Sequence, residues 1–281
     1  MAEFKDKDSN CADLTKRHDH DRYLTALYAP EEARQGLFAL YAFNYEISKI
    51  RQTVSEPMLG EIRLQWWREA IDGIFQGAPR SHEVIQLLAK TIKRHKLPPE
   101  NFLAMIDGRA QDIYDENPAD MAALDNYLSL TGGKLTCLAV HIVGQKDIDD
   151  LALALGKAWG YIGLVRAIPY HLSLKKNFIP AELMDQHGLG KSRFLSPDEP
   201  AKNAPVIMEL CRQAEQHLDF IHRNKGRIKG ASRSVFLLSA LARSYLKTIK
   251  KADYDPFRLE EKADAGFRQG RLLLSALFNR I

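Results

Sequence analysis

The chain has 281 residues, of which 45% are hydrophobic and 27% are charged, and its formal net charge is +4. No Pro-, Gly- or Ser-rich linker and no block of charge divides it, so we predict one domain with a substantial core. No apolar run approaches the roughly 18 residues that indicate a membrane-spanning helix. The charge is mild and the basic residues are not interleaved with aromatic ones, which argues against a nucleic-acid partner.

The cysteines and the N-terminal residues indicate a compartment. Cys11, Cys137 and Cys211 are odd in number and widely separated, a pattern that suggests reduced thiols and neither a disulfide framework nor a zinc site. The first residues include acids and contain no apolar signal-peptide region. We therefore expect a bacterial cytoplasmic protein with no signal peptide or transmembrane helix, and leave open a peripheral contact with the inner membrane.

The spacing of apolar residues predicts an all-α fold, because most long segments repeat them every three or four positions and strand-like alternation is rare. Residues 1–13 are expected to form a flexible tail and 14–281 a single domain. A stretch at 173–205 reads as irregular. The predicted helices cover 14–29, 33–51, 60–76, 83–96, 99–114, 123–143, 149–167, 206–224 and 232–251, with a last one from 259.

The string His18-Asp19-His20-Asp21 looks like a set of metal ligands. Residues two apart on a helix do not share a face, so a capping or surface role is the better interpretation. Asp112 and Asp115 also look like a metal pair, but acids at the edge of a loop are usually solvated.

The segment from Ile62 to Arg68 predicts an amphipathic helix that packs through aromatic residues. We expect Arg63 and Arg68 to pair with Glu69 or Asp72 at helical spacing. The aromatic residues expected in the core are Trp66, Trp67 and Phe75.

Gly132 and Gly133 interrupt a later helix. Small residues there allow either a ligand or a neighbouring helix to approach the backbone closely.

Two stretches carry a resemblance to a known family. The first is Ala39-Leu-Tyr-Ala-Phe43, and the second runs from Gly156 to Pro180 with Leu164-Val-Arg-Ala-Ile-Pro-Tyr-His171 at its centre. They resemble the segments around the two aspartate-rich motifs of squalene and phytoene synthases. Within that superfamily, the second string is most similar to the branch of mitochondrial complex I assembly factor 6 and its bacterial relatives. The resemblance implies an isoprenoid-synthase-like helical bundle around a central cavity.

The same resemblance places the metal-binding aspartates of these synthases at positions that hold no carboxylate here. Mg²⁺ takes oxygen ligands, whereas a neutral imidazole suits zinc or nickel better. Pro169 removes a backbone donor and should disturb the helix between the last two positions. We therefore expect no metal and no other cofactor. The positions concerned are Ser48, Lys49, Gln52, Ala167 and His171.

These losses leave basic side chains near both motifs. One interpretation is metal-free binding of a phosphate or lipid headgroup. The other is that the residues are solvated at the mouth of a pocket that has lost its ligand. The candidate anion-binding residues are Lys49, Arg166, His171, Lys175 and Lys176.

By resemblance, the protein is a pseudoenzyme that supports assembly of respiratory complex I, the NADH:quinone oxidoreductase, with complex I subunits or assembly intermediates as partners. No catalytic residue is assigned. One alternative is a Mg²⁺-dependent head-to-head prenyltransferase acting on prenyl diphosphates. Another is a non-catalytic carrier of an isoprenoid or lipid.

Residues 232–251 combine apolar positions with five basic residues. A basic amphipathic helix can lie on an anionic membrane surface. It is more often a packed helix with one solvated face, which is the interpretation we favour.

Overall fold

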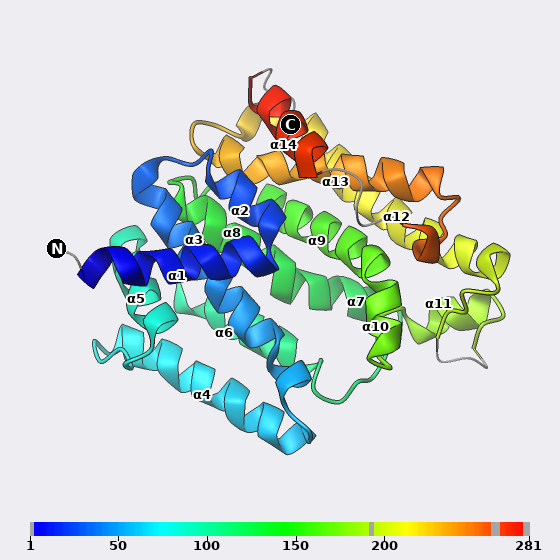
Figure 1. The fold of residues 1–281 in the computed structure, drawn as a ribbon, viewed down its shortest axis with the longest axis horizontal. Coiled ribbons are helices and arrows are strands. Elements are labelled where there is room, and N and C mark those ends of the chain that lie inside the picture. The colour runs from blue at the N-terminus through cyan, green and yellow to red at the C-terminus, as the bar shows by residue number, and fades with distance from the viewer. Residues whose placement is uncertain (1–2, 191–193, 260–264, 278–281) are drawn as a thin grey trace.

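The computed structural model describes residues 3–190, 194–259 and 265–277, and the described residues contain helices and no strand (Figure 1). The α-helices are α1 (Glu3–His18), α2 (His20–Ala26), α3 (Glu31–Ser48), α4 (Pro57–Phe75), α5 (Glu83–His95), α6 (Pro99–Ala110), α7 (Met121–Leu128), α8 (Lys134–Ile142), α9 (Asp149–Arg166), α10 (Ile168–Ser173), α11 (Ala181–Gln186), α12 (Pro200–Arg223), α13 (Ser232–Lys251) and α14 (Ala265–Leu277). Short 3₁₀ segments lie at η1 (Ile50–Thr53), η3 (Lys225–Arg227) and η4 (Pro256–Arg258), and η2 (Ser129–Gly133) is a π-helical turn. The all-α prediction is confirmed.

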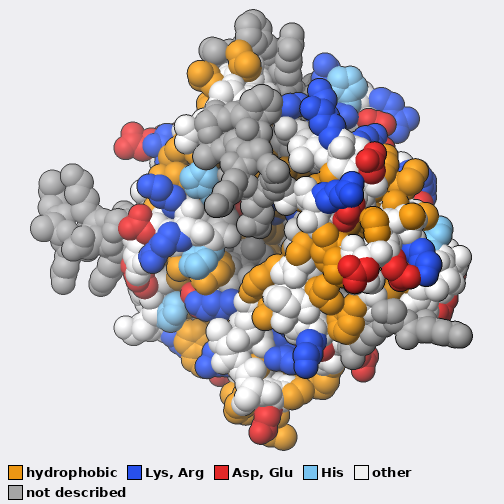
Figure 2. Space-filling view, turned by 45° about the vertical axis from the view of Figure 1, so that its right-hand side comes forward, with side chains coloured by type: hydrophobic (Ala, Val, Ile, Leu, Met, Phe, Trp, Pro, Cys, Tyr) orange, Lys and Arg blue, Asp and Glu red, His pale blue; other side chains and the backbone are white. Residues whose placement is uncertain are grey.

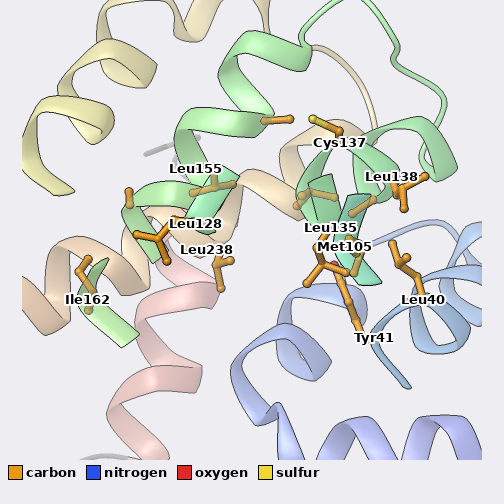
Figure 3. Packing of buried hydrophobic residues seen from close by; sticks show 14 of the residues in the cluster. Leu40, Tyr41, Met105, Leu128, Leu135, Cys137, Leu138, Leu155, Ile162 and Leu238 are labelled. Carbon is orange, nitrogen blue, oxygen red and sulfur yellow. The ribbon is translucent and has the colours of Figure 1, made fainter. Parts of the chain in front are cut away.

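Two helices form the centre of the bundle because apolar residues cover most of their circumference. In α3 the run from Ala39 to Phe43 is buried without interruption. In α9, buried residues extend from Leu151 to Val165, and the helix packs against α8, α12, α13 and η2. Figure 3 shows apolar side chains of several of these elements meeting in the core. The two central helices end at the two motif segments.

Local signals explain where the helices begin and end. Asp19 separates α1 from α2 because its side chain accepts a hydrogen bond from the backbone N–H of Arg22, as a helix cap does. The capping role is therefore confirmed, and the single helix predicted for 14–29 is wrong. Pro57 lies in the first turn of α4, and Gly77, at φ +80°, follows its end.

Other differences lie at the two ends of the chain and in the segment predicted as irregular. The described residues of the expected N-terminal tail are helical from Glu3, and residues 1–2 lie outside the described part. The stretch 173–205 contains α11 and the first turns of α12, which continues through Pro205. The last helix is described from Ala265, so the predicted start at 259 falls partly on residues outside the description.

The glycines near position 132 serve close packing. A Cβ atom added to Gly156 would lie 2.1 Å from the carbonyl oxygen of Gly132, and one added to Gly132 would lie 2.7 Å from that of Gly156. The backbones of η2 and α9 therefore meet directly, which confirms the close-packing interpretation.

Candidate functional site

The two degenerate motif segments lie side by side and are joined by a direct hydrogen bond. Ser48 ends α3, Lys49 follows it, and Gln52 lies in η1. The hydroxyl of Tyr170, in α10, donates to Oε1 of Gln52 at 3.1 Å. The segments that carry the paired aspartates in the synthases are thus linked here by neutral side chains.

The second segment is broken at Ala167, where the resemblance predicts the first carboxylate. Helix α9 ends at Arg166, Ala167 lies between the two helices, and α10 starts at Ile168 with Pro169 in its first turn. The predicted disturbance by Pro169 is confirmed.

In the first segment, the single nearby acid is already paired. Nζ of Lys49 lies 2.6 Å from Oε1 of Glu46 and 4.7 Å from the ring centroid of Tyr45. The hydroxyl of Ser48 donates to the carbonyl of Tyr45 at 2.9 Å. The segment therefore presents no unpaired carboxylate.

In the second segment, His171 is an uncharged side chain at neutral pH. Its ring lies 4.8 Å from that of Phe178, between centroids. Burial, with a smaller contribution from the charge of Lys176, lowers the pKa of the imidazole to about 4. A cavity of about 20 Å³ borders His171, Lys176 and Phe178, which is space for about one water molecule.

Arg166 is held by an aromatic ring and an acid from distant helices. Its guanidinium lies 3.7 Å from the ring centroid of Tyr245 in α13, a cation–π contact. Its Nη1 lies 3.9 Å from Oδ2 of Asp21 in α2, and the Tyr245 hydroxyl donates to the same oxygen at 2.7 Å.

Lys176 and Arg51 share the carboxylate of Asp115, in the turn after α6. Nζ of Lys176 lies 3.3 Å from Oδ1, and Nε of Arg51 donates to Oδ2 at 3.0 Å. Asp112, one turn earlier, is buried and lies 3.3 Å from Nη1 of Arg109. Burial raises the pKa of the Asp112 carboxyl, and the neighbouring Arg109 opposes this rise. The expectation that both acids are solvated is wrong, because both take part in ion pairs.

The candidate anion-binding residues thus differ in the positive charge that each could present to an anion. Lys49, Arg166 and Lys176 each have a carboxylate within 4.0 Å. His171 is neutral, and Lys175 is exposed at a left-handed φ of 55°. An anion near Lys49, Arg166 or Lys176 would compete with the carboxylate that already lies beside each of these side chains.

The residues at the motif positions do not fit a Mg²⁺ cluster, since none supplies a carboxylate. Within residues 3–190, 194–259 and 265–277, no group of three or more His, Cys, Asp or Glu side chains could hold a metal ion. The three cysteines are buried.

Sequence reasoning missed the partners that close this site. Asp21, Asp115 and Tyr245 come from three separate elements or turns, and no local spacing links them to the motifs. Tyr170 lies within the second motif segment, but the sequence does not show that it bonds to Gln52. The predicted ion pairs of Arg63 and Arg68 with Glu69 or Asp72 are also wrong. Arg68 pairs with Asp107 at 2.9 Å, and Arg63 donates to the Thr53 hydroxyl at 2.7 Å.

The aromatic residues of α4 differ in burial. Trp67 is 4% exposed and Trp66 packs at the edge of the core, as predicted, but Phe75 is 42% exposed. The prediction for Phe75 is therefore wrong.

Comparison with known proteins agrees with this architecture. The sequence profile of the squalene/phytoene synthase family matches residues 15–277. Rat "NADH dehydrogenase (ubiquinone) complex I, assembly factor 6" is 32% identical over 249 residues, which cover 88% of this chain and 75% of that protein. The presqualene diphosphate synthase of Sinorhizobium fredii is 29% identical over 174 residues, which cover 60% of this chain and 61% of that enzyme.

Solved structures show the same fold. A dehydrosqualene synthase in complex with ligand superimposes with a TM-score of 0.84 at 17% identity, covering 99% of this chain and 98% of that one. The chain belongs to the squalene/phytoene synthase family, and it matches complex I assembly factor 6 over more of its length than it matches the presqualene diphosphate synthase.

Proposed function

We propose that this protein supports the assembly of respiratory complex I, the NADH:quinone oxidoreductase, without catalysing prenyl transfer. The observation that carries the proposal is the combination of a synthase fold with motif positions that lack every metal-binding carboxylate. The likeness to assembly factor 6 over 249 residues supports the same role. Subunits or assembly intermediates of complex I are the proposed partners.

The chemistry of the site supports a non-catalytic role. A bound metal ion would neutralise the negative charge that develops on a departing diphosphate. Here that task would fall to Lys49, Arg166 and Lys176, whose charges are already offset by acids. A finer part of the proposal is that an isoprenoid or an anionic lipid contacts these residues together with His171 and Lys175.

A deletion strain tests the role in assembly. Removing the gene should lower NADH:quinone oxidoreductase activity in isolated membranes, and the wild-type gene should restore it. Assembly intermediates should accumulate on native gels of the deletion strain. Unchanged activity and unchanged amounts of assembled complex in the deletion strain would contradict the proposal.

Head-to-head prenyl transfer is the second candidate, favoured by the likeness to a presqualene diphosphate synthase. It requires Mg²⁺-dependent binding of a prenyl diphosphate, which the loss of carboxylates opposes. A carrier role would be supported by an isoprenoid or phospholipid that copurifies with the protein and is identified by mass spectrometry.

The compartment is also a proposal. No described helix is long and apolar enough to cross a bilayer. We infer a cytoplasmic location with peripheral contact at the inner membrane, where complex I is assembled. Fractionation should find the protein in the cytosol and on membranes from which a high-salt or carbonate wash releases it, and recovery in the periplasm would contradict the inference.

A further inference from the structure

The first turns of α4 expose three large apolar side chains. Met58 is 71% exposed, Leu59 45% and Ile62 59%. Met58 and Ile62 are four residues apart and so lie one above the other on the helix. Single exposed apolar residues are common, but three within two turns mark an interaction surface. Hydrophobic side chains are visible at the bottom of Figure 2, the level at which α4 begins in Figure 1.

Helix α13, the basic amphipathic helix that the sequence suggested for a membrane, has no such face. Its apolar residues are buried against α2, α9 and α14. Leu238, Leu241 and Ile249 are each at most 2% exposed. The packed interpretation of 232–251 is confirmed, whereas α4 leaves apolar side chains in solvent at its start.

A pocket lies on α4 next to the exposed stripe that Met58, Leu59 and Ile62 form. It has a volume of about 100 Å³ and is lined by Glu46, Lys49, Ile50, Thr53, Arg63, Trp66 and Trp67. Arg63 follows Leu59 by four residues and Trp66 follows Ile62 by four, so the pocket begins one turn beyond the stripe. No residue of α10 or of the second motif segment lines it, so it is separate from the cavity beside His171.

The cations of this pocket are not equivalent. Lys49 is held by Glu46 at 2.6 Å. The guanidinium of Arg63 donates to the neutral hydroxyl of Thr53, and no ion pair to a carboxylate is recorded for it among the described residues. Arginine with spare N–H donors is well suited to bind phosphate, and the pocket has room for more than one water molecule.

We propose that this end of α4 docks on a phospholipid surface with anionic headgroups. Met58, Leu59 and Ile62 enter the boundary between headgroups and acyl chains, and Arg63 binds a lipid phosphate at the pocket beside Trp66. Indole rings favour this interfacial depth, and apolar insertion with one basic contact is how amphipathic helices bind bilayers. The net charge of +4 favours an anionic surface.

Two acids near the stripe reduce the electrostatic part of the attraction to an anionic lipid surface. Glu56 is exposed just before α4, and Glu61 is half-buried in its second turn. These two carboxylates offset nearby positive charge, so insertion of the three apolar side chains supplies most of the binding and Arg63 supplies selectivity for phosphate.

Sedimentation of the full chain with lipid vesicles tests the proposal. Wild type should sediment with phosphatidylcholine vesicles that contain phosphatidylglycerol, and less with phosphatidylcholine alone. The double variant M58E/I62E should bind about tenfold more weakly or worse, since two large apolar side chains are lost from the contact. R63Q should bind about fivefold more weakly.

Met208 in α12 provides a matched control, because it is an exposed methionine at 48% that lies outside the stripe and the pocket. M208E should bind vesicles like wild type. The helical circular dichroism and thermal midpoint of each variant should match wild type, because the substituted side chains are exposed.

Three results would overturn the proposal. In the first, wild type stays in the supernatant with phosphatidylglycerol vesicles, or M58E/I62E binds them as well as M208E does. In the second, inorganic phosphate binds at Arg63 but no vesicle does. In the third, M58E/I62E loses complex I assembly yet keeps vesicle binding, which would assign the stripe to a protein partner. The vesicle assay contains no respiratory enzyme, so its outcome is independent of the role in assembly.

Discussion

At the scale of one residue, the neutral side chain of His171 explains why the second motif segment cannot hold Mg²⁺ as a pair of carboxylates would. Its side chain lies where the family resemblance predicts a metal-binding carboxylate, and it packs against Phe178. Burial and Lys176 lower the pKa of the imidazole to about 4. At neutral pH the residue therefore offers neither the negative charge that Mg²⁺ needs nor a positive charge for an anion.

The lowered pKa of His171 predicts a pH dependence of stability. Between about pH 6.5 and pH 4 the unfolded chain binds a proton at this imidazole that the folded chain does not, so the free energy of unfolding falls as pH falls through this window. The loss is on the order of 3 kcal/mol. Urea unfolding from pH 7 to pH 4.5, a range chosen to limit carboxylate titration, should show a smaller loss for H171Q than for wild type.

The exposed His222 provides the matched substitution for this experiment. H222Q should keep the wild-type slope of stability against pH. Equal slopes for H171Q and wild type would show that the imidazole of His171 is not held neutral by the fold.

Asp115 is the residue on which the closure of the site most depends. It accepts from Arg51 and pairs with Lys176, and its side chain is 25% exposed. D115N would leave two partly buried cations without their partner, and we expect the free energy of unfolding to fall by about 1–3 kcal/mol. Urea denaturation of D115N and wild type measures this loss of free energy.

An exposed ion pair gives the control for Asp115. Asp219 lies 3.5 Å from Arg243 with its side chain 65% exposed, and D219N should change stability by less than about 0.5 kcal/mol. Similar small effects for D115N and D219N would show that the paired cations are not held by Asp115.

At the scale of elements, the meeting of α9 with η2 fixes the end of α9 in the site. A methyl group on Gly156 would overlap the carbonyl of Gly132 at 2.1 Å, whereas nothing lies within 4 Å of the same position on Gly163. G156A should lower the free energy of unfolding by about 2 kcal/mol or more, from overpacking against backbone. G163A, in the same helix, should raise it by up to about 1 kcal/mol.

Thermal or urea unfolding of both glycine variants measures this difference. Because both substitutions have the same chemistry and the same helix, helix propensity cancels between them. If G156A were as stable as G163A, the backbones of α9 and η2 could not be in contact.

The elements near the site were predictable where a local signal decides them. Pro169 marks the break between α9 and α10 because it lacks a backbone donor. The capping role of Asp19 was predictable because caps act over a few residues, but the break that it makes within 14–29 was not predicted. Phe75 was not predictable, because its exposure depends on which helices cover the end of α4. The exposed stripe on α4 was missed for the same reason, since an apolar helical face looks identical in sequence whether or not another helix covers it.

At the scale of the whole molecule, the bundle has the fold of a dehydrosqualene synthase, and side chains from distant elements connect its two motif segments. Gln52 and Tyr170 bond to each other directly. Arg51 and Lys176, which are 125 positions apart in the chain, meet at Asp115. The family could be read from local strings, but these pairings could not, since they depend on how distant elements are placed.

The non-catalytic role is tested most directly by incubating the purified protein with labelled farnesyl and geranylgeranyl diphosphates, with and without Mg²⁺, and extracting the lipids. A presqualene diphosphate synthase assayed in parallel controls for the substrates. The paired cations and missing carboxylates predict no condensed product and no Mg²⁺-dependent binding of either diphosphate. A Mg²⁺-dependent head-to-head product would contradict the proposal and assign metal binding to residues other than the motif positions.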